Sequence, residues 1–217
     1  MRQIVGADHE FQDRDYAAGW AERFEPTPDR LKLFSLMLTE LQTRISPHGY
    51  VVELGMGPGY LAAHLLAGMP WIRYCGVDVS RPMLDIAAHR LRGYAPRIDY
   101  RQADLVTDEW WTELAGPIQI DAIVSTWALH DLGSQQSVAA VYAGCATALG
   151  GTGILLNGDF IKPARSIHDY EPGRFEITTH LEILHRGGFT SAECLAIFEE
   201  ELKSPTAAQN YACIRAT

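Results

Sequence analysis

This sequence lacks three features that would place it in large classes of protein. It has no run of about 20 consecutive apolar residues, the length that a membrane-spanning helix needs. Residues 1–15 lack the apolar middle section of a signal peptide. Lys and Arg form no cluster long enough to follow a phosphate backbone or an anionic membrane, and the formal net charge is -9 at pH 7. These absences argue against nucleic acid and membranes as partners and predict a cytoplasmic protein.

Short metal-binding and redox motifs are missing as well. The cysteines are far apart and lie in apolar surroundings, at Cys75, Cys145, Cys194 and Cys213. We interpret them as buried thiols. His180 and His185 do not have the i, i+4 spacing that places two metal ligands on one helical face. We therefore predict that the protein has no metal site.

What the sequence does have is the size and the apolar content of one domain, with 217 residues of which 47% are hydrophobic. From about Thr27 onward, short β-branched runs alternate with longer stretches of helical period. This alternation is typical of βαβ units that build a parallel sheet. It predicts a single α/β domain over residues 1–217.

The strands of this domain are expected at regular intervals. They are predicted at residues 50–54, 74–79, 98–102, 118–125, 151–157, 192–198 and 211–215. Thr27, Ser80 and Ser134 can each cap a helix with their hydroxyl group. The helix after Thr27 is predicted to bury a face made by Leu31, Phe34, Leu38, Leu41 and Ile45.

Residues 1–26 stand apart from this pattern. They contain an amphipathic stretch whose large residues are Phe11, Tyr16, Trp20 and Phe24. The segment is either a lid over a ligand or a helix packed on the domain, and both interpretations remain open. As a lid, it would bring Tyr16 and Trp20 to the substrate.

The most informative stretch is 51–59, an apolar strand that runs directly into a turn containing Gly55, Gly57 and Gly59. Residues without a Cβ let the backbone approach a ligand closely and turn tightly into a helix. Taken alone, such a turn is shared by nucleotide-binding folds and by ordinary tight turns. Asp78 strengthens the first interpretation because it ends the second strand, roughly 20 residues further on, where a carboxylate can accept both hydroxyl hydrogen bonds of a ribose. Asp78 could instead cap the following helix.

Several segments together resemble the S-adenosylmethionine (SAM) binding motifs of class I methyltransferases. ELGMGPG at 53–59, GVDVSRPML at 76–84 and QADL at 102–105 look like the first three motifs. IDAIVSTWALHDL at 120–132 is similar to the fourth motif of the small-molecule branch, which includes ubiquinone and menaquinone biosynthesis methyltransferases. The resemblance runs from about Thr27 to the end of the chain. It implies a Rossmann-like three-layer sandwich, with a mostly parallel seven-stranded sheet and an antiparallel C-terminal strand.

The resemblance also implies SAM as the cofactor and a small-molecule acceptor, in a monomer or homodimer. Its motifs carry over onto the cofactor-binding residues Glu53, Gly55, Gly57, Gly59, Asp78, Val79, Met83, Asp104, Leu105, Ser125, Thr126 and Trp127. Glu53 and the glycines would face the methionine part and the ribose, and Asp78 would hold the ribose hydroxyls. Val79 and Met83 would pack on the adenine, while Asp104 with Leu105 would meet its edge. The three residues 125–127 would lie beside the sulfonium, where Trp127 departs from the small or polar residue often found.

Methyl transfer from a sulfonium is an in-line displacement, so the main task is to hold the nucleophile behind the methyl group. Positioning supplies roughly 7–11 kcal/mol, and a general base adds about 10²–10⁴ in rate. His130 follows the fourth strand and is our candidate base, with a structural role near the helix start as the alternative. The segment 157–172 is expected to form a substrate wall through Asp159, Phe160, His168 and Tyr170.

Two other classes of function remain open at this point. One is a SAM-binding sensor or partner subunit without turnover of its own. The other is a nicotinamide-dependent dehydrogenase, which also uses a glycine turn and an acidic residue after the second strand. The dehydrogenase is less favoured because the third glycine follows the second too soon, and because ADL and STWALHDL have no role in it.

Overall fold

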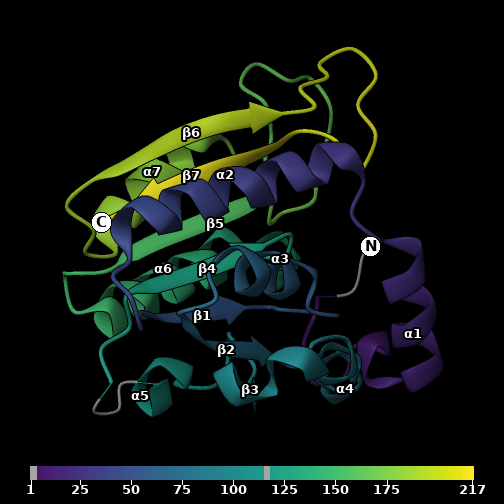
Figure 1. The fold of residues 1–217 in the computed structure, drawn as a ribbon. Coiled ribbons are helices and arrows are strands. Elements are labelled where there is room, and N and C mark those ends of the chain that lie inside the picture. Colours follow the sequence, from purple (N-terminus) through teal and green to yellow (C-terminus); the bar gives the residue numbers. More distant parts are fainter. Residues whose placement is uncertain (1–3, 115–117) are drawn as a thin grey trace.

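The computed structural model describes residues 4–114 and 118–217 and contains one sheet with the strand order β3-β2-β1-β4-β5-β7-β6 (Figure 1). The strands are β1 (Tyr50–Leu54), β2 (Arg73–Asp78), β3 (Ile98–Gln102), β4 (Ala122–Thr126), β5 (Ile154–Phe160), β6 (Ala192–Phe198) and β7 (Tyr211–Ala216). Strands β1 to β5 pair in parallel, and β7 lies antiparallel between β5 and β6. The mostly parallel seven-stranded sheet with an antiparallel C-terminal strand is thereby confirmed.

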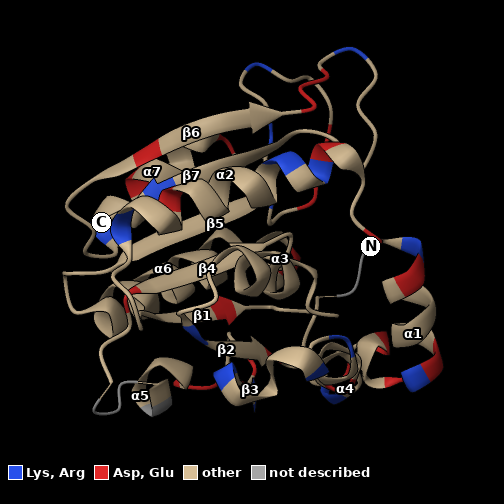
Figure 2. Cartoon of the chain, in the orientation of Figure 1, with Lys and Arg blue, Asp and Glu red and all other residues tan. Residues whose placement is uncertain are grey.

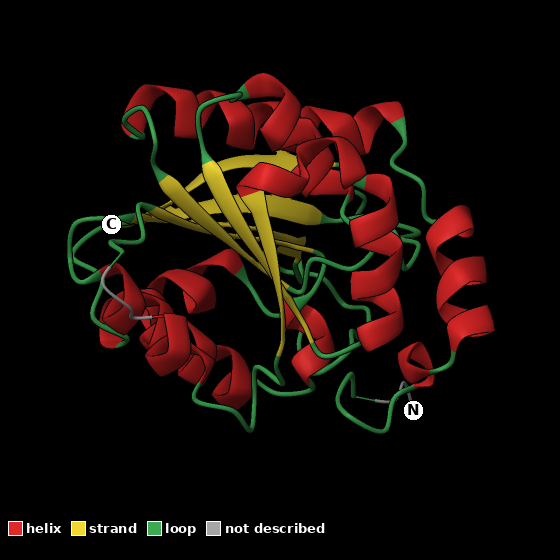
Figure 3. Cartoon of the chain, turned by 60° about the horizontal axis from the view of Figure 1, so that its bottom comes forward, coloured by secondary structure: helices red, strands yellow, loops and turns green. Residues whose placement is uncertain are grey.

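Helices cover both faces of this sheet (Figure 3). The α-helices are α1 (Arg14–Arg23), α2 (Pro28–Arg44), α3 (Tyr60–Gly68), α4 (Arg81–Arg90), α5 (Trp110–Leu114), α6 (Gln135–Leu149) and α7 (Ile177–Arg186). Short 3-10 helices are η1 (Glu10–Gln12), η2 (Arg92–Arg97) and η3 (Leu129–Leu132). One core cluster joins α2, α3 and α4 to the sheet, and a second joins α5, α6 and α7 to its other face. The three layers match the predicted sandwich.

The predicted helix caps are present. The hydroxyl groups of Thr27, Ser80 and Ser134 accept hydrogen bonds from backbone N–H groups in the first turns of α2, α4 and α6. These bonds satisfy donors that a helix start otherwise leaves without partners. They fix where each of the three helices begins, and for α4 and α6 this also sets the length of the loop after the preceding strand.

Some boundaries and faces differ from the prediction. In α2, Leu31 is 40% exposed while Leu33 and Met37 are fully buried, because the buried face of the helix runs through Leu33, Phe34, Met37 and Leu41. Strand β4 starts at Ala122, and Ile118 lies outside it with 41% exposure.

Strand β5 is shifted toward the C-terminus relative to the predicted range 151–157. Gly150 and Gly151 have φ values of 60° and 77°, which an extended strand does not allow, so the strand begins only at Ile154. The strand then continues to Phe160. Asp159 and Phe160 are therefore strand residues, whereas the sequence placed them in a loop.

The N-terminal segment lies across the end of the sheet where the parallel strands finish, with α1 packed beside α4 (Figure 1). Lys and Arg are spread over separate elements, among them α1, α2 and α4, and do not gather on one face in the view of Figure 2. Among residues 4–114 and 118–217, none of the helices combines the length and the apolar content that crossing a membrane requires.

Candidate functional site

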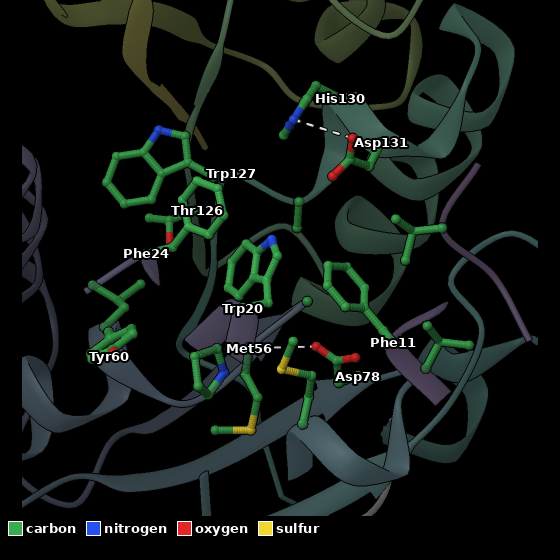
Figure 4. A pocket seen from close by; sticks show the side chains of 18 of the residues that line it. Phe11, Trp20, Phe24, Met56, Tyr60, Asp78, Thr126, Trp127, His130 and Asp131 are labelled. Atoms are coloured by element: carbon green, nitrogen blue, oxygen red, sulfur yellow. Dashed lines mark hydrogen bonds and ion pairs between the residues drawn. The ribbon is translucent and has the colours of Figure 1, made fainter. Parts of the chain in front are cut away.

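A cavity of about 660 Å³ opens at the carboxyl ends of the parallel strands, under the N-terminal segment (Figure 4). Its volume lies in the range of small-molecule and cofactor pockets, roughly 300–1,000 Å³. The wall combines the turn after β1, the ends of β2, β3, β4 and β5, the segment from η1 to the start of α2, and Ala207 with Ala208. Parallel strands bring distant parts of the sequence together at this edge.

The three glycines of the turn after β1 serve different purposes. Gly55, Gly57 and Gly59 have φ values of 65°, 51° and 79°, a region that side chains disfavour. A Cβ on Gly55 would lie 2.4 Å from the Cβ of Ala128, and one on Gly59 would lie 3.1 Å from that of Ala87. A Cβ on Gly57 would meet nothing within 4 Å. Gly55 and Gly57 line the cavity, whereas Gly59 permits close packing against α4 and is not part of the wall.

Asp78 ends β2 at the cavity wall beside this turn. Its carboxylate accepts hydrogen bonds from the backbone N–H of Gly57 at 2.8 Å and from that of Ser80 at 2.9 Å. The capping hydroxyl of α4 belongs to Ser80, which accepts from the N–H of Met83 at 3.1 Å. Burial raises the pKa of Asp78 despite these bonds. Ser80, and not Asp78, therefore supplies the side-chain cap of α4. Asp78 is a hydrogen-bond acceptor held in a fixed position at the cavity.

Glu53 is the second buried carboxyl group at the turn and is only 1% exposed. The hydroxyl of Tyr74 donates to it at 2.8 Å. Burial raises the pKa of Glu53 to about 8, so the protonated form is favoured at neutral pH. A cation placed against this group would stabilise its charged form.

Val79, Met83, Asp104 and Leu105 form the adjoining wall. The carbonyl of Val79 accepts from the side-chain amides of Gln12 and Gln102, both at 3.1 Å. This pairing ties η1 to the ends of β2 and β3. We call the wall made by Glu53, Gly57, Asp78, Val79 and Asp104 the glycine-turn side.

The end of β4 supplies two of the three residues predicted there. Thr126 and Trp127 line the cavity. Ser125 is fully buried and donates its hydroxyl to the carbonyl of Leu54 at 2.9 Å, so it joins β4 to β1 and is not part of the wall. Trp127 has a φ of 49°, and its buried indole N–H has no hydrogen-bond partner among the described residues. A strained backbone and an unpaired buried donor are typical of functional positions.

Aromatic side chains form the opposite wall, which we call the aromatic side: Phe24, Phe34, Trp127 and Phe160. The ring of Trp127 lies 5.7 Å from that of Phe34 and 6.4 Å from that of Phe160, measured between centroids. The guanidinium of Arg30 lies 4.8 Å from the Trp127 ring. Tyr16 and Trp20 of α1 also line the cavity.

His130 lies in η3 at the border between the two sides and lines the cavity, although it is only 6% exposed. Its Nδ1 lies 2.8 Å from a carboxylate oxygen of Asp159, and its backbone N–H donates to the other oxygen at 2.9 Å. Its Nε2 lies 3.3 Å from a carboxylate oxygen of Asp131 (Figure 4). Burial lowers the pKa of His130, but the charge and hydrogen bond of Asp159 outweigh burial, so the pKa is raised overall.

Asp159 therefore contacts His130 and does not form part of the cavity wall, contrary to its predicted place in a substrate loop. The reason is the later end of β5, which keeps Asp159 inside the sheet. Burial raises the pKa of Asp159, and the contacts with His130 reverse this effect and lower it. Phe160, the next residue, lines the cavity.

His168 and Tyr170 lie outside the cavity, in a separate hollow of about 430 Å³. Arg174 holds this segment against the loop that carries Ala207. It pairs with Glu171 at 2.7 Å and donates to the carbonyl of Ala207 at 2.6 Å. The segment thus turns away after β5, and it does not form the substrate wall expected of it.

The cavity also includes residues that sequence reasoning did not assign to a site, among them Phe11, Phe24, Arg30, Met56, Tyr60, Ala207 and Ala208. The amphipathic pattern singled out Phe11 and Phe24 without giving them a function. Met56 lies within the glycine-turn motif and could have been included. Arg30 had no signal, because a lone arginine in the first turn of a helix looks like a solvated surface residue.

Comparison with known proteins agrees with this architecture. Residues 51–153 match the model of a family described as a methyltransferase domain. No curated protein sequence matches the chain. The glycine turn, Asp78 and the end of β4 all lie within the matched range. Residues 51–153 are thus similar to a methyltransferase domain.

Solved structures show the same fold over nearly the whole chain. The carbon methyltransferase of CurJ superposes with a TM-score of 0.73 at 14% identity, covering 98% of this chain and 61% of that chain. Human N-acetylserotonin methyltransferase, solved in complex with SAM, gives 0.67 at 15% identity, covering 98% and 59%. The YcgJ protein from Bacillus subtilis gives 0.66 at 12% identity, covering 85% and 97%. The chain therefore spans about three fifths of the CurJ and human chains. At such low identity the likeness establishes the fold alone.

Proposed function

We propose that this protein transfers a methyl group from SAM to a small-molecule acceptor. The observation that carries the proposal is the division of one cavity into two chemically different sides. The glycine-turn side offers carboxylates and exposed backbone, which suit a nucleoside with a charged tail. The aromatic side offers flat apolar surfaces with His130 at the border.

The residues present fit SAM as the cofactor. The open space at the Cβ position of Gly57 lets a ligand contact the backbone, and Asp78 is fixed beside it as a hydrogen-bond acceptor. On this proposal, Asp78 holds the ribose hydroxyls, and Val79, Met83, Asp104 and Leu105 surround the adenine. Glu53 then faces the cationic methionine end. A SAM complex of the human relative in this fold supports the assignment.

When bound, SAM supplies an electrophilic methyl group on a positively charged sulfur. The chain's own task is to align an acceptor atom behind that methyl group and to exclude water. Trp127, in its left-handed backbone conformation, is part of the aromatic side on which the acceptor would lie. His130 can take a proton at Nε2 from an acceptor hydroxyl or ammonium, with Asp159 holding its ring by Nδ1. The acceptor would then take the place of the Asp131 carboxylate that lies 3.3 Å from Nε2.

Residues 1–26 act on this proposal as a lid. Phe11, Tyr16, Trp20 and Phe24 all face the cavity, and Phe11 and Trp20 are in edge-to-face contact at 5.3 Å. The hydroxyl of Ser80 donates to the carbonyl of Phe11, and that of Tyr60 donates to the carbonyl of Ala21 at 2.7 Å. A few such bonds would hold the segment closed without preventing it from opening.

The proposal also covers the cellular location, the oligomeric state and the metal requirement of the protein. We keep a cytoplasmic location, because all four cysteines are free thiols, as expected in a reducing compartment. The acceptor is a small molecule, the protein acts as a monomer or homodimer, and no metal takes part. Among the described residues, no group of three or more His, Cys, Asp or Glu side chains could hold a metal ion.

Calorimetric titration with SAM, S-adenosylhomocysteine and NADH tests the proposal, followed by an acceptor screen that detects methylated products by mass spectrometry. Binding of both SAM compounds with product formation is expected. Binding without any methylated product would favour the sensor or partner-subunit alternative. Binding of NADH in place of SAM would favour the dehydrogenase, and binding of neither would refute a nucleotide site.

A further inference from the structure

Arg30 lies in the first turn of α2 and brings a guanidinium to the aromatic side of the cavity. The group lies 4.8 Å from the ring of Trp127 and 5.9 Å from that of Phe24. Arg30 is half-buried and lines the cavity. No salt bridge is formed by it within the described residues. The charge of Glu199 acts on Arg30, but the Glu199 carboxylate accepts its hydrogen bond from the hydroxyl of Tyr211 at 3.0 Å.

The charges of the cavity wall are distributed unevenly. Its acidic residues are Glu10, Glu53, Asp78, Asp104 and Asp131. Among the described wall residues, Arg30 is the one Lys or Arg. A cation that is half removed from water, without an ion pair, keeps donors available for a ligand. The positive charge of Arg30 also contrasts with the net charge of the whole chain, which is -9.

The surroundings of Arg30 restrict the shape of such a ligand. Trp127, Phe34 and Phe160 present ring faces and edges to the same part of the cavity. Stacking on these rings favours a flat aromatic body. The planar guanidinium matches a carboxylate through two parallel hydrogen bonds. The two features together define a molecule that is aromatic at one place and anionic at another.

We propose that the methyl acceptor is an aromatic carboxylic acid whose carboxylate binds Arg30 while its ring packs against Trp127. This inference rests on the proposed methyl transfer and specifies its substrate class. The methionine part of SAM also carries a carboxylate, so the carboxylate that binds the Arg30 guanidinium could come from either the acceptor or SAM. The position of Arg30 over Trp127 and Phe24, on the aromatic side, assigns it to the acceptor.

The test compares ligand pairs that differ only in the anionic group. The probes are the isomeric hydroxybenzoates and hydroxynaphthoates, each paired with its neutral amide. Their binding is measured by calorimetry with and without saturating S-adenosylhomocysteine. Arg30→Met keeps the apolar stem, and Arg30→Lys keeps the charge but loses the planar fork. Arg44→Met is the matched control, since Arg44 lies in the last turn of the same helix, paired with Glu40 at 3.2 Å.

In the wild-type protein and in Arg44→Met, at least one acid is expected to bind about tenfold or more tightly than its amide. Arg30→Met should remove this difference, and Arg30→Lys should retain part of it. Affinity for S-adenosylhomocysteine should stay within about twofold in every variant.

Two results would overturn the inference. One is an absence of any acid-over-amide preference in the wild-type protein. The other is an Arg30→Met variant that loses affinity for S-adenosylhomocysteine while keeping the preference, which would assign Arg30 to the methionine carboxylate. Failure of the methyl-transfer proposal looks different: the wild-type protein would then bind no SAM compound, whatever its preference among the acids.

Discussion

The glycine-turn side and the aromatic side of the cavity are built in different ways. The glycine-turn side comes from consecutive βα units, in which each functional residue lies at or just beyond the end of a strand. The aromatic side is assembled from the C-terminal end of α1, the first two turns of α2, and the ends of β4 and β5. The first is fixed by the sheet, and the second by segments that pack onto the sheet's edge.

This difference separates what the domain shares with its fold from what distinguishes it. Backbone geometry dictates the glycine-turn side, because a parallel sheet always presents its strand ends at one edge. Loops and added helices can vary without disturbing the sheet, and they are where ligand specificity is usually encoded. We therefore expect substitutions on the glycine-turn side to change cofactor binding, and those on the aromatic side to change turnover or acceptor binding.

The largest expected effect is at His130, on the border between the two sides. His130→Ala should lower turnover by about 10²–10⁴, the usual contribution of a general base, while affinity for SAM stays unchanged. Because the change leaves Asp159 buried without its partner, His130→Gln serves as a second variant that can still donate to it. Single-turnover rates and calorimetry measure the two quantities. Unchanged turnover with the true acceptor would remove the base assignment.

The pH dependence of turnover is a second test of His130 as the general base. A base must be deprotonated, and the pKa of His130 is raised above its usual 6.5, so the rate should rise with pH along a limb centred above 6.5. Asp159→Asn removes the charge that raises this pKa, and the limb should shift to lower pH. An unshifted limb in that variant would argue that another group is titrating.

Asp78 gives the next largest effect, on the other side of the cavity. Asp78→Ala removes a charged acceptor and should weaken binding of S-adenosylhomocysteine by about 30- to 100-fold. Asp85→Ala is the control, because Asp85 pairs with Arg81 at 3.0 Å on the surface of α4 and does not line the cavity. Thermal unfolding separates loss of binding from loss of fold. Equal affinities of the two variants would contradict the ribose assignment.

The contrast between the two sides also explains how far the sequence could predict this protein. The strands and the parallel pairing of most of them follow from alternating strand and helix patterns, and Asp78, Asp104 and Thr126 follow from their places at or near strand ends. Arg30 and Phe24 could not be assigned in this way. Their function depends on how α1 and α2 pack over the cavity, and no local pattern encodes that packing.

The segment after β5 shows a second limit of sequence patterns. The sequence places Asp159 in a loop because the predicted strand starts at Gly151 and ends at Asn157, three residues before the observed end at Phe160. His168 and Tyr170 have polar side chains of a kind that fits a binding site. Only the pairing of Arg174 with Glu171 and Ala207 shows that the segment turns away from the cavity.

Two glycines allow the effect of Gly57 on ligand binding to be separated from the cost of backbone strain. Gly57 and Gly150 have φ values of 51° and 60°, and a Cβ on either would meet nothing within 4 Å. Alanine at each should therefore cost about 1–2 kcal/mol of stability for the left-handed conformation. Gly57→Ala alone places a methyl group in the cavity, and it should weaken binding of S-adenosylhomocysteine by about tenfold. Equal affinities in both variants would show that Gly57 does not contact the ligand.

The smallest effect expected is a fraction of a proton released when SAM binds, and it comes from Glu53. Burial holds the pKa of this group at about 8, so most of its population is protonated at pH 7. A positive charge nearby favours the carboxylate and lowers this pKa, so binding of a cationic ligand should expel the proton. Calorimetry at pH 7 in buffers of different ionisation enthalpy measures the release. SAM carries the sulfonium charge that S-adenosylhomocysteine lacks, so it should release more. Glu53→Gln should abolish the release, and proton uptake in the wild-type protein would contradict the placement of the methionine end beside Glu53.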